Sequence, residues 1–247
     1  MSGFARPLLA RVLLALAPLA LVMPVPAFAE GEKLLTELPA GKPLTLRPDR
    51  AYILYRTPTM KGVLESDTVF MLDIGRTAYP GDNLARVRNS NPYATSATES
   101  FYLVEAIPGH YVIAGQSHKA FRNTETCMCM GTVGFEARAG VITDLGYILT
   151  DRIDTVSPVP EFHDLSGRGA QINGFGAMLV STVRPPTPAM PVPAALSSLP
   201  REPADLRAVD KFPNRFAIMV NRMAPIPGIL DYDEDRVIDL KRDRPKP

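Results

Sequence analysis

Four sulfur-bearing residues follow one another at Cys127-Met128-Cys129-Met130, and the chain has no other cysteine. Thiolate and thioether groups are the ligands that select Cu(I) in proteins. The run therefore indicates a soft-metal or thiol-redox site, with copper as the implied cofactor. His118, nine residues before the first cysteine, is the histidine that we add to this site. The candidate metal ligands are thus Cys127, Cys129, Met130 and His118.

Strand geometry favours a different role for the two cysteines. Side chains alternate between the two faces of an extended strand, so Cys127 and Cys129 share one face. That face continues with apolar residues as far as Ala137, whereas the alternate positions continue with mostly polar ones. This phase favours the cysteines as buried free thiols that fill the core, as free cysteines commonly do. A bulge at Gly131 would reverse the phase.

A disulfide between Cys127 and Cys129 is the third interpretation. Residues two apart in an extended strand have Cα atoms near the upper limit of about 7 Å for a bridge. The bridge therefore requires a local kink in the chain. The sequence leaves all three interpretations open.

Other patterns that perform chemistry are incomplete. Asp231, Asp233 and Asp235 have the spacing with which a calcium-binding loop begins, but Arg236 and Arg242 stand where an EF-hand has Gly and Glu. The sequence contains no Gly-x-Ser-x-Gly and no His-Glu-x-x-His motif. Two carboxylates brought together from distant strands remain the one route to catalysis, so we favour a protein that is not an enzyme.

The elements that must position these residues are strands. The chain has 25 prolines and no tryptophan, and its apolar residues alternate with polar ones between frequent turn signals. Pro108-Gly109 predicts a turn that joins residues 101–106 and 111–114 in a hairpin. A turn at 138–140 predicts a second hairpin between 127–137 and 141–150. We therefore predict an all-β, antiparallel β-sandwich-like domain, with a Pro-rich C-terminal extension that packs back onto it.

The chain divides into four parts. Residues 1–29 read as a signal peptide, because Arg6 and Arg11 precede a short apolar run and the triplet Ala27-Phe28-Ala29. The expected parts are the signal peptide at 1–29, the β-sandwich-like domain at 30–184, a Pro-rich linker at 185–204 and the C-terminal extension at 205–247. We expect the mature protein in the periplasm or secreted, without a transmembrane segment.

Charge and composition limit the partners. Without residues 1–29 the net charge is about −1, which does not favour a nucleic acid partner. With 46% hydrophobic and 21% charged residues the chain has the composition of a globular protein. The expected partner is an unknown protein or another component of the cell envelope.

Two motifs carry a resemblance to a group of known proteins. Pro108-Gly109-x-Tyr111, followed by Phe135-x-Ala137-x-x-Gly140-x-Ile142-x-x-Leu145-Gly146, resembles uncharacterised exported proteins of Gram-negative bacteria with a β-sandwich-like domain of unknown function. Many of those are lipoproteins, whereas this chain has no cysteine near the expected cleavage site. The resemblance implies a fold and no activity. We expect a non-catalytic binding or structural module of the bacterial cell envelope, with the soft-metal or thiol-redox protein as the alternative.

Overall fold

The structure is a computed structural model, and it describes residues 33–40, 44–59, 68–75, 83–118, 124–152, 159–163 and 179–242. They belong to one compact unit, Lys33–Pro247. The expected signal peptide at 1–29 lies outside the described residues. Within those residues, no helix is both long and apolar enough to cross a membrane.

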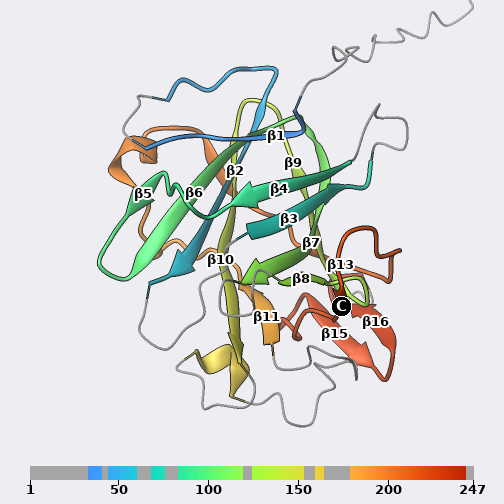
Figure 1. Cartoon of the computed structure of the whole chain (residues 1–247). Helices are drawn as coiled ribbons and strands as arrows, with labels where there is room; N and C mark the ends of the chain where they lie inside the picture. The colour runs from blue at the N-terminus through green and yellow to red at the C-terminus, as the bar shows by residue number, and fades with distance from the viewer. Residues whose placement is uncertain are drawn as a thin grey trace, which may run out of the picture. The chain divides into compact units, whose positions relative to one another are not determined.

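Sheet A, as far as the structure describes the chain, has the strand order β1-β6-β2-β10-β11 (Figure 1). Two short strands extend it, because β5 pairs with β6 and β12 pairs with β10. The bounds of its strands are Leu35–Glu37 for β1, Ala51–Pro58 for β2, Ala94–Thr95 for β5, Glu99–Ala106 for β6, Ile142–Arg152 for β10, Leu179–Arg184 for β11 and Arg201–Pro203 for β12.

Sheet B has the order β13-β9-β7-β3-β4, and β8 lies between β7 and β14. The bounds of its strands are Thr68–Asp73 for β3, Leu84–Arg88 for β4, Gly109–His118 for β7, Thr124–Cys127 for β8, Thr132–Ala137 for β9, Arg207–Val209 for β13 and Met219–Val220 for β14. A separate hairpin near the C-terminus consists of β15, Leu230–Asp233, and β16, Arg236–Asp239. Within the described ranges, two short 3-10 helices, η2 at Pro160–Phe162 and η3 at Ala194–Leu196, lie outside the sheets.

The two sheets pack face to face. Thr150 of β10 donates a hydrogen bond to Gln116 of β7, and this bond joins sheet A to sheet B through the interior. The rings of Tyr111 and Phe135, on neighbouring strands of sheet B, stack with centroids 6.1 Å apart. The all-β, sandwich-like fold that the sequence predicts is confirmed. Most of its strand pairs are antiparallel as expected, but β2 and β12 run parallel to β10, and β14 runs parallel to β8.

Both faces of the sheets are buried. All eight residues of β2 are buried, although only one face of a strand can point between two sheets. The outer face of sheet A packs against residues 191–199 of the Pro-rich segment, where Leu196 of η3 is fully buried. On the outer face of sheet B, Phe70 and Val112 pack against Phe212 and Phe216 of the C-terminal extension. The extension therefore packs back onto the domain, as the sequence predicts.

Both predicted hairpins are wrong in their pairing. β6 lies in sheet A and β7 in sheet B, so the Pro108-Gly109 turn carries the chain from one sheet to the other. Likewise β9 pairs with β7 and β13, whereas β10 pairs with β2, β11 and β12. The chain bends at Pro108 and turns at Gly140, close to the predicted places, although Gly109 itself belongs to β7. Turn residues determine where the chain reverses, but the reversal fits a cross-sheet corner as well as a hairpin.

Candidate functional site

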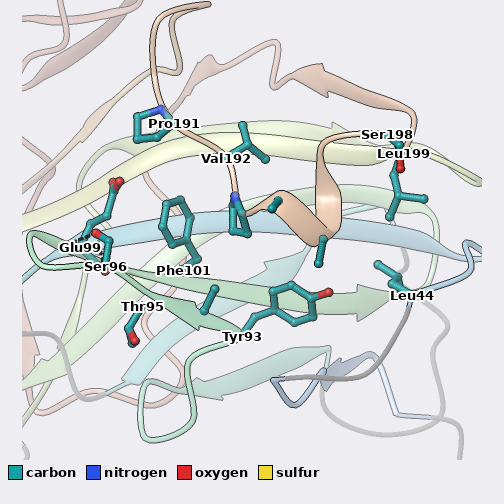
Figure 2. Close-up of a pocket in the computed structure, with 14 residues that line it drawn as sticks. Leu44, Tyr93, Thr95, Ser96, Glu99, Phe101, Pro191, Val192, Ser198 and Leu199 are labelled. Carbon is teal, nitrogen blue, oxygen red and sulfur yellow. Dashed lines mark hydrogen bonds between the residues drawn. The ribbon is translucent and has the colours of Figure 1, made fainter.

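A groove of about 760 Å³ crosses the outer face of sheet A (Figure 2). One side is formed by β5, β6 and the residues that precede them, and the other by the Pro-rich segment with its short helix η3. Its lining comprises Leu44, Tyr93, Ala94, Thr95, Ser96, Glu99, Phe101, Pro191, Val192, Pro193, Ala194, Ala195, Ser198 and Leu199. The volume lies within the range of about 300–1,000 Å³ that small-molecule sites occupy.

The central part of the groove is aromatic and apolar. Tyr93 and Phe101 lie across the strands with 5% and 4% of their surface exposed, and Val192 lies opposite them. The hydroxyl of Tyr93 is buried and has no hydrogen-bond partner. Burial also raises the pKa of Tyr93, so the group stays a neutral hydroxyl. An unpaired buried hydroxyl costs free energy.

Among the lining residues that the structure describes, Glu99 is the one charged residue. Its side chain is buried and accepts a hydrogen bond from the hydroxyl of Tyr147. Burial, followed by the hydrogen bond to Glu99, raises the pKa of Tyr147 to about 12. The Tyr147 hydroxyl therefore keeps its proton at neutral pH and donates it in a hydrogen bond to Glu99. This bond holds the Glu99 side chain in place at the edge of the groove.

A buried ionic cluster fastens the Pro-rich segment above the groove. The guanidinium of Arg56 is fully buried and donates to both carboxylate oxygens of Asp144, at 3.0 and 2.8 Å. Arg201 donates to the same carboxylate at 2.7 Å, and Arg56 also donates to the carbonyl of Pro191 at 3.1 Å. The Arg56 guanidinium lies 5.3 Å from the ring centroid of Phe101. These contacts connect β2 and β10 to the groove wall, so the wall is anchored to the sheet.

A second cavity, of about 600 Å³, is lined in part by Tyr147. Arg184 and Glu161 form a two-point ion pair at its edge, and the Arg184 guanidinium lies 5.4 Å from the ring centroid of Tyr147. The hydrogen bond from Arg184 lowers the pKa of Glu161. Because Arg184 and Glu161 neutralise each other's charge, neither is left to bind a charged group of a ligand. This cavity is therefore less suited than the groove to hold a polar ligand.

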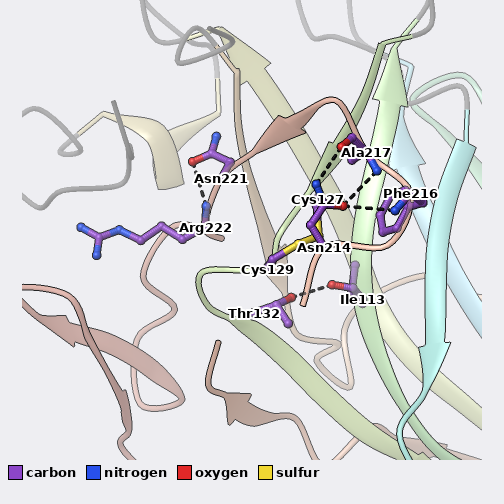
Figure 3. The surroundings of a disulfide bond; sticks show 9 residues. All are labelled: Ile113, Cys127, Cys129, Thr132, Asn214, Phe216, Ala217, Asn221 and Arg222. Carbon is purple, nitrogen blue, oxygen red and sulfur yellow. Dashed lines mark hydrogen bonds between the residues drawn. A yellow bond between two sulfur atoms is a disulfide. The ribbon is translucent and has the colours of Figure 1, made fainter. Parts of the chain in front are cut away.

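Cys127 and Cys129 form a disulfide, with Cα atoms 5.2 Å apart (Figure 3). The expectation of free thiols is therefore wrong. β8 ends at Cys127 and the chain turns through Gly131, which has a φ of 140°. The turn arises because β8 and β9 pair with successive parts of one edge of β7, where Cys127 faces Gly115 and Gly134 faces Val112. The chain between them is too long for the edge and bulges out, which supplies the kink that the bridge requires.

The two cysteines and Met130 lie in one turn, whereas His118 lies further along β7. In the disulfide neither sulfur is a thiolate, so the copper site stays a prediction for the reduced protein. His118 faces Thr124 across β7 and β8, three positions along from the partner of Cys127, and Met130 is half-buried in the turn. Among the described residues, no group of three or more His, Cys, Asp or Glu side chains is arranged to hold a metal ion.

Sequence reasoning missed the groove. The residues that form it are Tyr93 and Phe101 on one side and 191–199 on the other, and they are far apart in the chain. One signal was available, because Val192, Leu196 and Leu199 are larger apolar residues within a segment that otherwise reads as an exposed linker. Comparisons with protein-family models, curated proteins and solved structures found no match.

Proposed function

We propose that this protein is a non-catalytic binding module of the bacterial cell envelope, and that the groove on sheet A holds its ligand. The observation that carries the proposal is the groove itself, which has an aromatic centre and a wall anchored by the buried Arg56–Asp144 pair. A wall held by buried contacts is formed before the ligand arrives, so binding does not have to order it.

The lining indicates the chemistry of the ligand. The centre of the groove is apolar, and its polar groups are the hydroxyls of Thr95, Ser96 and Ser198 together with the carboxylate of Glu99. No lysine or arginine is among the lining residues that the structure describes. A negatively charged head group would meet a carboxylate and no cation. The ligand that fits is a neutral amphiphile, with an apolar chain and a hydroxyl-bearing head.

We propose a protein without catalytic activity because of the groups that the lining of the groove offers. Glu99 is the single carboxylate among the described lining residues, and it already accepts a hydrogen bond from the hydroxyl of Tyr147. No histidine or cysteine is among the described lining residues that could serve as a base or nucleophile. The groove can bind and orient a molecule, and it offers no pair of groups for acid–base chemistry.

Export to the periplasm or beyond is the second part of the proposal. It is supported by the features of residues 1–29, and the compact unit begins at Lys33, so cleavage after Ala29 removes nothing from it. The disulfide adds support, because disulfides persist mainly in oxidising compartments.

The test is calorimetric titration with octyl glucoside, a neutral amphiphile, below its critical micelle concentration. The comparison ligands are octanoate, with a negative head group, and octyltrimethylammonium, with a positive one. Both have an alkyl chain of similar length to that of octyl glucoside. Ala195→Trp places a large ring in the exposed lining of the groove and should weaken binding of octyl glucoside at least about tenfold. Ala139→Trp, at an exposed turn away from the groove, is the matched control and should leave the affinity unchanged.

Equal binding by the wild type, Ala195→Trp and Ala139→Trp would show that the amphiphile binds elsewhere, and the proposal would be rejected. Tighter binding of octanoate than of octyl glucoside would contradict the charge argument. No binding of any of the three probes would reject the amphiphile as the ligand class.

A further inference from the structure

The turn Cys127–Gly131, which contains the disulfide, is bound on its backbone by the C-terminal extension. The carbonyls of Cys127, Cys129 and Gly131 accept hydrogen bonds from the amides of Asn221, Phe212 and Met223, at 2.8, 3.0 and 2.8 Å. In the reverse direction, the amide of Met130 donates to the carbonyl of Asn221 at 3.2 Å. Backbone bonds of this kind require the turn to keep one conformation, since a change in its dihedral angles would misalign several bonds at once.

The disulfide is enclosed where the extension meets sheet B. Cys127 is fully buried and Cys129 is 2% exposed. Figure 3 shows Ile113 and Thr132 of sheet B on one side, and Asn214, Phe216, Ala217 and Asn221 of the extension around the bridge. A reductant therefore has no direct path to the sulfurs while the extension is in place.

The extension also covers an apolar surface. Phe216 stacks on Phe70 with centroids 4.6 Å apart. Its ring lies so close to Gly115, the cross-strand neighbour of Cys127, that a Cβ atom there would come within 2.9 Å. Phe212 packs on the same cluster, which contains Val112. If the extension moved away, the outer face of sheet B would be exposed to solvent.

We propose that the Cys127–Cys129 disulfide is a redox-sensitive latch, which holds the C-terminal extension against sheet B when it is oxidised and loosens it when it is reduced. The latch is independent of the groove on sheet A. The bridge works by restricting residues 127–131 to the conformation that the four backbone hydrogen bonds require.

Reduction of the latch needs a dithiol as its partner. The S–S bond of Cys127–Cys129 accepts two electrons and two protons and becomes two thiols, while the dithiol loses the same and becomes a disulfide. Linkage makes the effect reciprocal. If oxidation favours the docked extension, then a docked extension favours the oxidised bridge, and weakening the contact must make the bridge easier to reduce.

The first experiment is amide hydrogen exchange of the whole protein, oxidised and after reduction with dithiothreitol. The amides of Phe212, Asn221 and Met223 report the docked extension, and the amide of Ile142, bonded to Pro200 in sheet A, is the internal control. The disulfide closes a loop of three residues, and its reduction returns conformational entropy to the opened chain. The entropy for a loop of this length predicts that reduction lowers protection of the three amides by about fifteenfold. Protection of Ile142 should stay the same.

The second experiment tests the reciprocal effect on variants. Phe216→Ala removes the ring that packs on Phe70, and the equilibrium constant for reduction of the bridge by dithiothreitol should then rise about tenfold or more. Ile218→Ala, at a residue that is 88% exposed in the same segment, is the matched control. The doubly substituted Cys127→Ala/Cys129→Ala protein supplies the open loop without any reductant, and its exchange pattern should match that of the reduced wild type.

Unchanged protection of Phe212, Asn221 and Met223 in both the reduced and the alanine-substituted proteins would overturn the latch. Loss of protection at Ile142 to the same degree would also overturn it, because the bridge would then stabilise the whole fold and not the extension. Equal equilibrium constants of reduction for Phe216→Ala and Ile218→Ala would refute the reciprocal part.

Discussion

Two glycines with similar backbone angles have very different surroundings. Gly146 interrupts β10 with a φ of 78°, and Asp144 accepts a hydrogen bond from its amide at 2.9 Å. A Cβ atom on Gly146 would lie 2.1 Å from the carbonyl oxygen of Arg184, which belongs to the neighbouring strand. Gly140 has a φ of 74°, and the nearest atom to its Cβ position is 3.8 Å away.

We therefore expect Gly146→Ala to lower the free energy of unfolding by more than about 3 kcal/mol, because the angle and the collision act together. Gly140→Ala is the matched control and should cost only about 1–2 kcal/mol, from the angle alone. Unfolding in urea measures both. Similar losses in the two variants would contradict the role given to the Arg184 carbonyl.

A single tyrosine gives a pH dependence that can be assigned. The pKa of Tyr147 is raised from 10.0 to about 12 by burial and by its hydrogen bond to Glu99. The neutral hydroxyl is favoured in the folded protein, so its contribution to stability is fully present below pH 10 and is lost as the pH rises toward 12. Other buried tyrosines also respond to alkali, and a variant is needed to isolate this one.

Tyr147→Phe should lower the free energy of unfolding at neutral pH by about 1–3 kcal/mol, because Glu99 loses its donor. The difference between the wild type and Tyr147→Phe should then shrink as the pH is raised between 10 and 12. Urea unfolding at a series of pH values checks this. A difference that stays constant over that range would refute the assignment.

At the scale of elements, the Pro-rich segment acts as a layer of the fold. Leu196 of η3 is fully buried in the cluster that contains Tyr52, Leu54 and Phe101. The same part of the chain continues into β12, and the amide of Ala204 donates to the carbonyl of Asp144 at 2.8 Å. Proline favours the extended backbone that lies along a sheet, and the apolar residues between the prolines supply the contact surface.

Leu196→Ala should therefore lower the free energy of unfolding by about 2–5 kcal/mol, as expected for a large residue removed from a core. Ile218→Ala, which changes an exposed residue, should stay within about 0.5 kcal/mol of the wild type. Denaturant unfolding of both variants makes the comparison. A loss below 1 kcal/mol for Leu196→Ala would show that the segment is a loosely attached linker.

At the scale of the whole molecule, segments from the C-terminal part of the chain cover both sheets. Residues 191–199 cover sheet A, and Phe212 and Phe216 cover sheet B. A sandwich whose outer faces carry Phe70, Leu103 and similar residues would expose large apolar patches without these covers. The central sandwich therefore depends on residues that follow its last long strand, β11.

The proposed export makes a prediction about the mass of the mature chain. Protein recovered from the periplasm without reductant should have the intact mass of residues 30–247, lowered by two hydrogens for the Cys127–Cys129 bridge. Mass spectrometry before and after reduction measures both features. A mass that includes residues 1–29 would contradict the signal peptide, and a mass unchanged by reduction would contradict the bridge.

The sequence by itself determined the class of fold and the places where the chain turns. Alternation of apolar and polar residues and the preferences of Pro and Gly are local properties, so the all-β class and the turn at Pro108-Gly109 could be predicted from neighbouring residues. Only the tertiary structure decided which strands pair. A corner between sheets and a hairpin within one sheet use the same turn residues, and both predicted hairpins join different sheets.

The candidate sites also depend partly on local sequence and partly on the tertiary structure. The Cys127–Cys129 spacing allowed a bridge only if the chain was kinked, and the kink comes from the competition of β8 and β9 for one edge of β7. The groove depends on Tyr93 and Phe101 meeting residues 191–199. Contacts between residues about a hundred positions apart are set by the packing of complete sheets, and local sequence patterns carry no record of that packing.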